Sequence, residues 1–126
     1  MTTEIKEELL YTKEHEWVKI EGDVATVGIT DFAQSSLGDI VFLELPETGA
    51  NVDQDGAFGV VESIKSVSDL YAPLSGEVVE VNAELPDGPE KLNEAPYSNW
   101  LIKIKLSNAD EKANLLSAKQ YGEHCG

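Results

Sequence analysis

The sequence predicts a mainly β domain, a sandwich or flattened barrel with a short helix after the first strand pair and a longer helix near the C-terminus. Short apolar runs rich in β-branched residues recur along the chain, and turn signals separate them roughly every ten residues. The 126 residues, of which 41% are hydrophobic, suit one core. Gly and Pro are scattered singly at turn positions. We therefore expect one domain over residues 1–126, with 1–9 flexible and 122–126 frayed.

The N-terminal half opens with a strand pair and a short helix. The strands are expected at residues 17–20 and 24–29, because a Gly-containing connection typical of a hairpin joins them. In the helix that follows, Thr30 or Asp31 can cap the first turn, and Gly38 stands where a C-terminal glycine belongs.

Four further strands are expected at residues 40–45, 57–64, 78–81 and 100–106. The first of these reads as largely buried and stops at Pro46. The last alternates, with Lys103 and Lys105 on one face, which is typical of a half-buried strand.

The C-terminal part, from Asn108 to about Tyr121, predicts the one longer helix. Asp110 and Glu111 fall in its first turn and Lys119 near its end, which suits the helix dipole. Elsewhere, residues 22–27 and 76–81 share the pattern Gly, acid, Val, two residues, Val. A pseudo-twofold domain would produce this pattern, and so would any turn followed by a β-branched strand.

The charge excludes several classes of function. Nine positive residues, all lysines, stand against 24 aspartates and glutamates, for a net charge of −15. Phosphate contacts need a basic footprint, so we expect no nucleic-acid partner, no anionic membrane partner and no nucleotide-handling enzyme. No apolar run approaches the roughly 20 residues needed to span a bilayer. The first residues are acidic and lack a signal-like apolar region, so we expect a cytoplasmic protein.

Residues 51–62 nearly match a calcium-binding EF-hand loop. Oxygen-bearing side chains and a glycine stand at the required spacing, at Asn51, Asp53, Asp55, Gly56 and Glu62. An EF-hand needs a helix on each side, however, whereas Pro46 and Gly49 precede this segment and an apolar strand follows it. We therefore expect a solvated turn and no metal site.

Catalytic constellations are equally weak. His15 and His124 are the only imidazoles, which is too few for a His-rich metal site. Cys125, the single cysteine, lies at a terminus expected to fray, which cannot preorganise a nucleophile. No Gly-rich phosphate loop or nucleophile elbow is present. None of these patterns predicts a catalytic site.

Lys65 stands alone among acids. An apolar strand reaches it and the chain then returns toward a second strand through Pro73 and Gly76, which predicts a position at or near a hairpin tip. It could be an ordinary exposed lysine or a Schiff-base nucleophile. The nucleophile needs a lowered pKa, whereas Glu62 and Asp69 would hold the lysine charged.

Residues 62–82, which begin Glu-Ser-Ile-Lys-Ser-Val-Ser-Asp-Leu-Tyr-Ala-Pro, resemble the lipoyl-lysine segment of the glycine cleavage system H protein family. The resemblance covers residues 10–121. Its other motifs occur in family order, at residues 11–18, 27–34, 37–46, 93–97 and 100–104. Between Pro96 and Trp100 the chain is one residue shorter than the family pattern.

The resemblance implies a lipoyl-domain-like fold and a monomeric, non-enzymatic shuttle. Lipoate would be attached to Lys65 by an amide bond and act as a swinging arm. The arm would accept an aminomethyl group from glycine decarboxylase (P protein) and present it to the aminomethyltransferase (T protein). Dihydrolipoamide dehydrogenase (L protein) would then reoxidise it. Lipoylating enzymes are further implied partners.

The resemblance also implies roles for acidic residues and for one serine. Glu62, Ser68 and Asp69 would flank the attachment site and aid recognition. Glu16 and Asp69 would pair with the ammonium of the loaded arm in a cleft. Glu14 stands where relatives have a smaller residue such as Ser.

Other carriers remain as alternatives. A lipoyl domain of a 2-oxo acid dehydrogenase is generally shorter and lacks the terminal extensions. A biotinyl carrier typically has Met on both sides of its lysine, where this chain has Ile64 and Ser66. A family member that donates lipoyl groups to other proteins would have the same sequence features.

Overall fold

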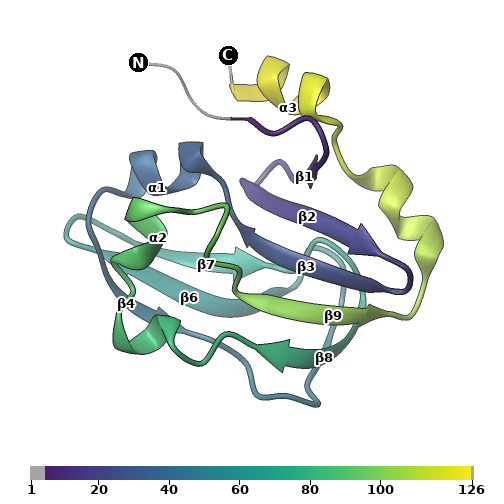
Figure 1. Cartoon of the computed structure of the whole chain (residues 1–126), viewed down its shortest axis with the longest axis horizontal. Helices are drawn as coiled ribbons and strands as arrows, with labels where there is room; N and C mark the ends of the chain where they lie inside the picture. Colours follow the sequence, from purple (N-terminus) through teal and green to yellow (C-terminus); the bar gives the residue numbers. More distant parts are fainter. Residues whose placement is uncertain (1–4, 126) are drawn as a thin grey trace.

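The computed structural model describes residues 5–125 as two antiparallel sheets packed face to face and not closed into a barrel (Figure 1). The larger sheet has the strand order β1-β2-β3-β9-β8-β5 and the smaller one the order β4-β6-β7. The larger sheet comprises β1 (Leu10–Tyr11), β2 (Glu16–Glu21), β3 (Val24–Ile29), β5 (Asn51–Val52), β8 (Gly76–Val81) and β9 (Ile102–Leu106). The smaller sheet comprises β4 (Ile40–Glu44), β6 (Ala57–Ser63) and β7 (Val67–Tyr71).

Helical segments connect and cover the sheets. They are α1 (Asp31–Leu37), α2 (Lys91–Glu94), α3 (Ala118–Cys125) and the 3₁₀ turns η1 (Leu85–Asp87) and η2 (Ala109–Asn114). No helix in the part of the chain that the structure describes is long and apolar enough to cross a membrane. The mainly β prediction, with a short early helix and a C-terminal helix, is confirmed.

The first hairpin and α1 form as local sequence signals predict. Gly22 adopts a φ of 64° in the turn between β2 and β3. The Thr30 hydroxyl accepts a hydrogen bond from the Ala33 backbone N–H at 3.1 Å, which caps α1. Gly38 ends the helix with a φ of 79°, a conformation that favours glycine. The two segments that share a sequence pattern become β3 and β8, which flank β9 on either side.

Two strands of the smaller sheet differ from the prediction. The polar segment after Lys65, taken as a return loop, forms β7 and pairs with β6 along its whole length. β4 is less buried than expected, because a β-bulge interrupts its pairing between Ile40 and Phe42 and leaves Val41 and Phe42 exposed.

The predicted continuous helix over residues 108–121 is wrong. The chain forms η2, runs extended past Leu116, and then forms α3, which continues through Cys125. The break has a tertiary cause, because Leu116 and Tyr11 exchange two backbone hydrogen bonds of 2.7 and 2.8 Å. This bridge sets α3 beside β1 (Figure 1). His124 on α3 reaches the Lys13 carbonyl at 3.1 Å.

The EF-hand-like segment forms β5, a turn and most of β6, with no flanking helices. Asp55 in that turn has a φ of 68°. At the N-terminus, residues 1–4 of the stretch expected to be flexible lie outside the described residues. Leu9 is buried and packs with Tyr11, Trp17 and Tyr121.

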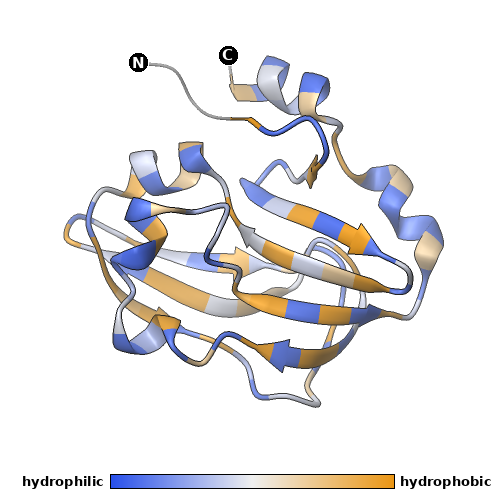
Figure 2. Ribbon diagram, viewed as in Figure 1, coloured by the Kyte–Doolittle hydropathy of each residue, from blue (hydrophilic) through white to orange (hydrophobic). Residues whose placement is uncertain are grey.

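The main core fills the space between the sheets, and Figure 2 shows the alternating apolar and polar residues that produce it along the strands. A second core lies under α3, where the Tyr11 and Tyr121 rings stack with centroids 4.5 Å apart. The Tyr121 hydroxyl lies 2.7 Å from Thr30 Oγ1 and 2.8 Å from His15 Nδ1. These contacts tie α3 to the start of α1 and to the loop before β2.

We predict that Tyr121→Phe lowers the free energy of unfolding by about 1–2 kcal/mol, because two partly buried hydrogen bonds are lost while the ring remains. Urea unfolding measures the change. Lys119→Ala, an exposed change on the same helix, should alter stability by less than about 0.5 kcal/mol. Equal effects of the two substitutions would contradict this role for the hydroxyl.

Candidate functional site

Lys65 lies at the exposed tip of the β6–β7 hairpin. The turn is held from within, because the Ser63 backbone N–H donates to the Ser66 carbonyl at 2.8 Å. The Ser63 hydroxyl accepts from the backbone N–H groups of Lys65 and Ser66 at 3.3 and 3.2 Å. The tip is also held from outside, since the Ile64 N–H donates to the Asp39 carbonyl at 3.0 Å. Lys65 is therefore exposed on a backbone that is fixed.

The predicted hairpin position of Lys65 agrees with the structure, but the return strand was misplaced. β7 begins at Val67, two residues after the lysine, rather than beyond Pro73 and Gly76. The hairpin is thus tight, and β7 leads directly from the lysine into a neighbouring cleft.

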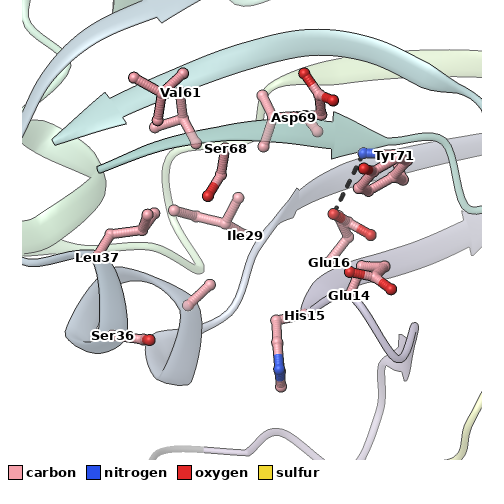
Figure 3. Close-up of a pocket in the computed structure, with 13 residues that line it drawn as sticks. Glu14, His15, Glu16, Ile29, Ser36, Leu37, Val61, Ser68, Asp69 and Tyr71 are labelled. Carbon is pink, nitrogen blue, oxygen red and sulfur yellow. Dashed lines mark hydrogen bonds between the residues drawn. The ribbon is translucent and has the colours of Figure 1, made fainter.

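The cleft has a volume of about 430 Å³ and lies between β7, α1 and the start of β2 (Figure 3). Its lining is apolar toward α1, where Ile29, Leu37 and Val61 face it. Its lining is polar toward β2, where Glu14, Glu16 and Tyr71 gather. The remaining lining residues are His15, Ala33, Ser36, Val67, Ser68, Asp69 and Leu70.

Glu16 is the most constrained acid of the cleft, with only 2% of its surface exposed. Thr12 Oγ1 donates to one of its carboxylate oxygens at 2.6 Å, and the Tyr71 N–H donates to the other at 3.4 Å. Burial raises the pKa of Glu16 to about 8, the two hydrogen bonds oppose this rise, and nearby Glu14 adds to it. A pKa near 8 favours the protonated form of Glu16 at neutral pH.

The structure brings Glu16, Ser68 and Asp69 to one cleft, as three of the predicted site residues. Asp69 is exposed on β7 and sits at the rim, and its carboxylate does not point at Glu16 (Figure 3). Glu62 does not line the cleft; it is half-buried on β6 opposite Val67. Glu14, whose role the sequence left open, lies beside Glu16 (Figure 3).

Sequence reasoning missed several residues of the site. Thr12 and the Tyr71 backbone hold Glu16, and no local pattern indicates either contact. His15 lines the cleft with a φ of 71°, stacks on Phe32, and has a pKa lowered by burial and by His124.

Within residues 5–125, no group of three His, Cys, Asp or Glu side chains is arranged to hold a metal ion. The candidate site therefore consists of an exposed lysine on a fixed hairpin and, beside it, a cleft that is apolar at one end and acidic at the other.

Comparison with known proteins assigns a family to this arrangement. The sequence pattern of the family described as Glycine cleavage H-protein matches residues 9–126. The chain belongs to the glycine cleavage H-protein family. The match covers the hairpin, the cleft and both C-terminal helical segments.

Individual members of the family are similar over nearly their whole length. The glycine cleavage system H proteins of Staphylococcus carnosus (strain TM300) and Staphylococcus epidermidis (strain ATCC 12228 / FDA PCI 1200) are each 57% identical over 123 residues. Each alignment covers 97% of this chain and 98% of the relative. The crystal structure of a glycine cleavage system H protein from Mycobacterium marinum superposes with a TM-score of 0.86 at 41% identity. It covers 94% of this chain and 97% of that one.

We predict a specific pH dependence from Glu16. Between pH 4.5 and about 8 the folded chain holds a proton on Glu16 that the unfolded chain has lost. Unfolding therefore releases a proton, and the free energy of unfolding falls as the pH rises through this window. Glu16→Gln should remove this contribution, which amounts to at most about 1.4 kcal/mol per pH unit.

Urea unfolding of both proteins at pH 5.5, 6.5 and 7.5 measures the effect. Glu21→Gln, an exposed carboxyl on the same strand, is the matched control and should leave the slope unchanged. The same slope in wild type and Glu16→Gln would contradict the burial of a protonated carboxyl here.

Proposed function

We propose that this chain is the lipoyl-carrying shuttle of a glycine cleavage system, with lipoate joined to the Nζ atom of Lys65. The observation that carries the proposal is a solitary lysine at the tip of a fixed hairpin beside a cleft of matching character, in a chain of the H-protein family. The chain itself acts as a carrier, and its partner enzymes supply the catalysis.

When bound, the lipoyl group supplies a dithiolane that takes up an aminomethyl group derived from glycine and passes it to the next enzyme. The role of the chain itself is to present the lysine to other enzymes. The hydrogen bonds of Ser63 and Ile64 fix the turn, so Lys65 is held away from the body where other active sites can reach it. Glu62, Ser68 and Asp69 flank the lysine and offer polar contacts by which its position can be recognised.

The cleft can bind the end of the arm and shield it from water. Asp69 lies four positions after Lys65, which corresponds to a distance of at most roughly 13 Å along the chain. The apolar wall formed by Ile29, Leu37 and Val61 suits the hydrocarbon part of an arm. The acidic end suits an ammonium group, which favours the ionised form of Glu16 and so lowers its pKa from about 8.

The proposed partners are the P, T and L proteins and the enzymes that attach lipoate, with the carrier acting as a monomer in the cytoplasm. A net charge of −15 favours basic docking surfaces on these partners. Such complexes form fast, weaken with salt and release readily, which suits a carrier that visits several enzymes in turn.

We predict that Lys65 carries one lipoyl group when the protein is purified from lipoate-replete cells. Intact-mass and peptide spectra should show the added mass on the peptide that contains Lys65. The Lys65→Arg variant keeps the charge but offers no acylatable amine, so it should lack the addition. An unmodified Lys65 in cells that lipoylate other proteins would overturn the proposal.

We also predict that Glu16 protects the aminomethyl group. In the lipoylated protein loaded with it, Glu16→Gln should speed its loss to water by roughly ten-fold, since a charge-assisted contact to the ammonium is removed. Release of formaldehyde in the absence of partner enzymes measures the loss.

Asp69→Asn tests the rim of the cleft in the same assay and should have a smaller effect, because Asp69 is solvent-exposed. Glu21→Gln lies outside the cleft and is the matched control. A rate equal to wild type in Glu16→Gln would show that the cleft does not hold the ammonium end through this residue.

A further inference from the structure

Exposed apolar side chains gather around Lys65. Across residues 5–125, the large apolar side chains with the greatest exposure are Ile64 (71%), Val67 (65%), Val41 (56%) and Phe42 (45%). A fifth, Val79 (39%), lies apart on β8 of the other sheet. We call Val41, Phe42, Ile64 and Val67 the tip patch.

The residues of the tip patch lie near one another on the smaller sheet and its hairpin, with the half-buried Glu62 between Phe42 and Val67. Phe42 pairs with Glu62, and Glu62 pairs with Val67, so Phe42 and Val67 share one face of the smaller sheet about 10 Å apart. The neighbouring row, Leu43, Val61 and Ser68, belongs to the opposite face, where Leu43 and Val61 are buried in the core. The Ile64 N–H joins the hairpin to the Asp39 carbonyl next to β4. Figure 2 shows apolar colour at the end of this hairpin.

The fold does not require these side chains to be apolar. The turn is stabilised by Ser63 and by backbone groups, none of which involves the side chain of Ile64. Val41 is the extra residue of the bulge in β4 and packs into neither core. Polar residues would serve equally at these two positions, and exposed apolar side chains that gather at one site are typical of a contact with a partner.

The reach of Lys65 decides which partner this is. An unmodified lysine side chain extends only about 6 Å, a few carbon–carbon bonds from its backbone. An enzyme that acylates the bare lysine must therefore close over the hairpin tip. Later partners can act at the end of the longer arm.

We propose that the tip patch is the docking surface for the enzyme that joins lipoate to Lys65. This inference rests on the proposed function. The enzyme presents an apolar rim around its active-site opening, bordered by basic residues that face the exposed Asp39, Glu44 and Asp69. In the step itself, the neutral Nζ amine forms a C–N bond with the carbonyl of ATP-activated lipoate. The C–O bond to AMP breaks, and the amine loses one proton.

The test uses the full-length unmodified protein with an ATP-dependent lipoate–protein ligase, lipoate and ATP, and follows acylation by intact mass. The double variant Val41→Thr, Ile64→Ser, whose two positions lie outside the cleft, should lower kcat/KM for acylation by at least about ten-fold, mainly through KM, because two aliphatic contacts with the enzyme are weakened. Val79→Thr is the matched control and should stay within about two-fold of wild type. Thermal unfolding verifies that all three proteins are folded.

A second readout separates docking of the acylating enzyme from general damage. After prolonged acylation, the double variant should be a normal substrate for dihydrolipoamide dehydrogenase, which reaches the arm and not the tip. Wild-type acylation rates in the double variant would overturn the docking surface while leaving the shuttle function intact. An equal loss with both enzymes would also overturn it. Failure of the wild-type protein to be acylated at Lys65 would instead overturn the proposed function.

Discussion

The corner between α1 and β4, at residues 38–40, is the constraint on which the position of Lys65 depends. Asn93, from the distant α2, holds this corner through its side chain. Its Nδ2 donates to the Gly38 carbonyl at 2.8 Å, and its Oδ1 accepts from the Ile40 N–H at 2.8 Å. The Asp39 carbonyl between them then receives the Ile64 N–H of the hairpin tip. The backbone at Lys65 is thus held by the hydrogen bonds of its own turn and, through the corner, by Asn93, which lies 53 residues after Ile40.

The same corner explains why a glycine and an asparagine matter here. Gly38 takes the positive φ that ends α1 and turns the chain into β4. Asn93 supplies both a donor and an acceptor, and it bonds the Gln34 side chain as well at 3.1 Å. An amide side chain is needed because the two backbone groups it serves have opposite polarity. The residues that support the site are therefore distributed over α1, β4 and α2.

Local signals made the early part of the fold predictable, and tertiary contacts limited the rest. The first hairpin and α1 follow from Gly22, Thr30 and Gly38, each of which acts within a few residues. The helix predicted over 108–121 breaks because Leu116 pairs with Tyr11, a contact that no periodicity encodes.

The candidate site divides in the same way. The hairpin position of Lys65 could be predicted from the sequence, because a solitary lysine between two apolar strand runs is a local feature. The setting of Glu16 could not be, since the burial that raises its pKa is a tertiary effect, and its hydrogen bonds come from Thr12 and from the backbone N–H of Tyr71, 55 residues away. The role of Glu14 as a neighbour of Glu16 likewise depends on the His15 backbone, whose φ of 71° bends the chain between them.

A carrier of the proposed kind has two opposed requirements, which are access to the lysine and shelter for what its arm holds. β7 meets both requirements because its burial changes along its length. Val67 near the tip is exposed, Leu70 is buried in the core, and Tyr71 beyond it binds Glu16 through its backbone. The strand connects the two regions rigidly, so their separation is set by its rise per residue. An arm of fixed length anchored at Lys65 can then reach either outward into a partner or back along β7 into the cleft. Which position the arm takes depends on how strongly the acidic end of the cleft binds the group that the arm carries. An ammonium group there stabilises the ionised form of Glu16 and so offsets the cost of burying this carboxyl.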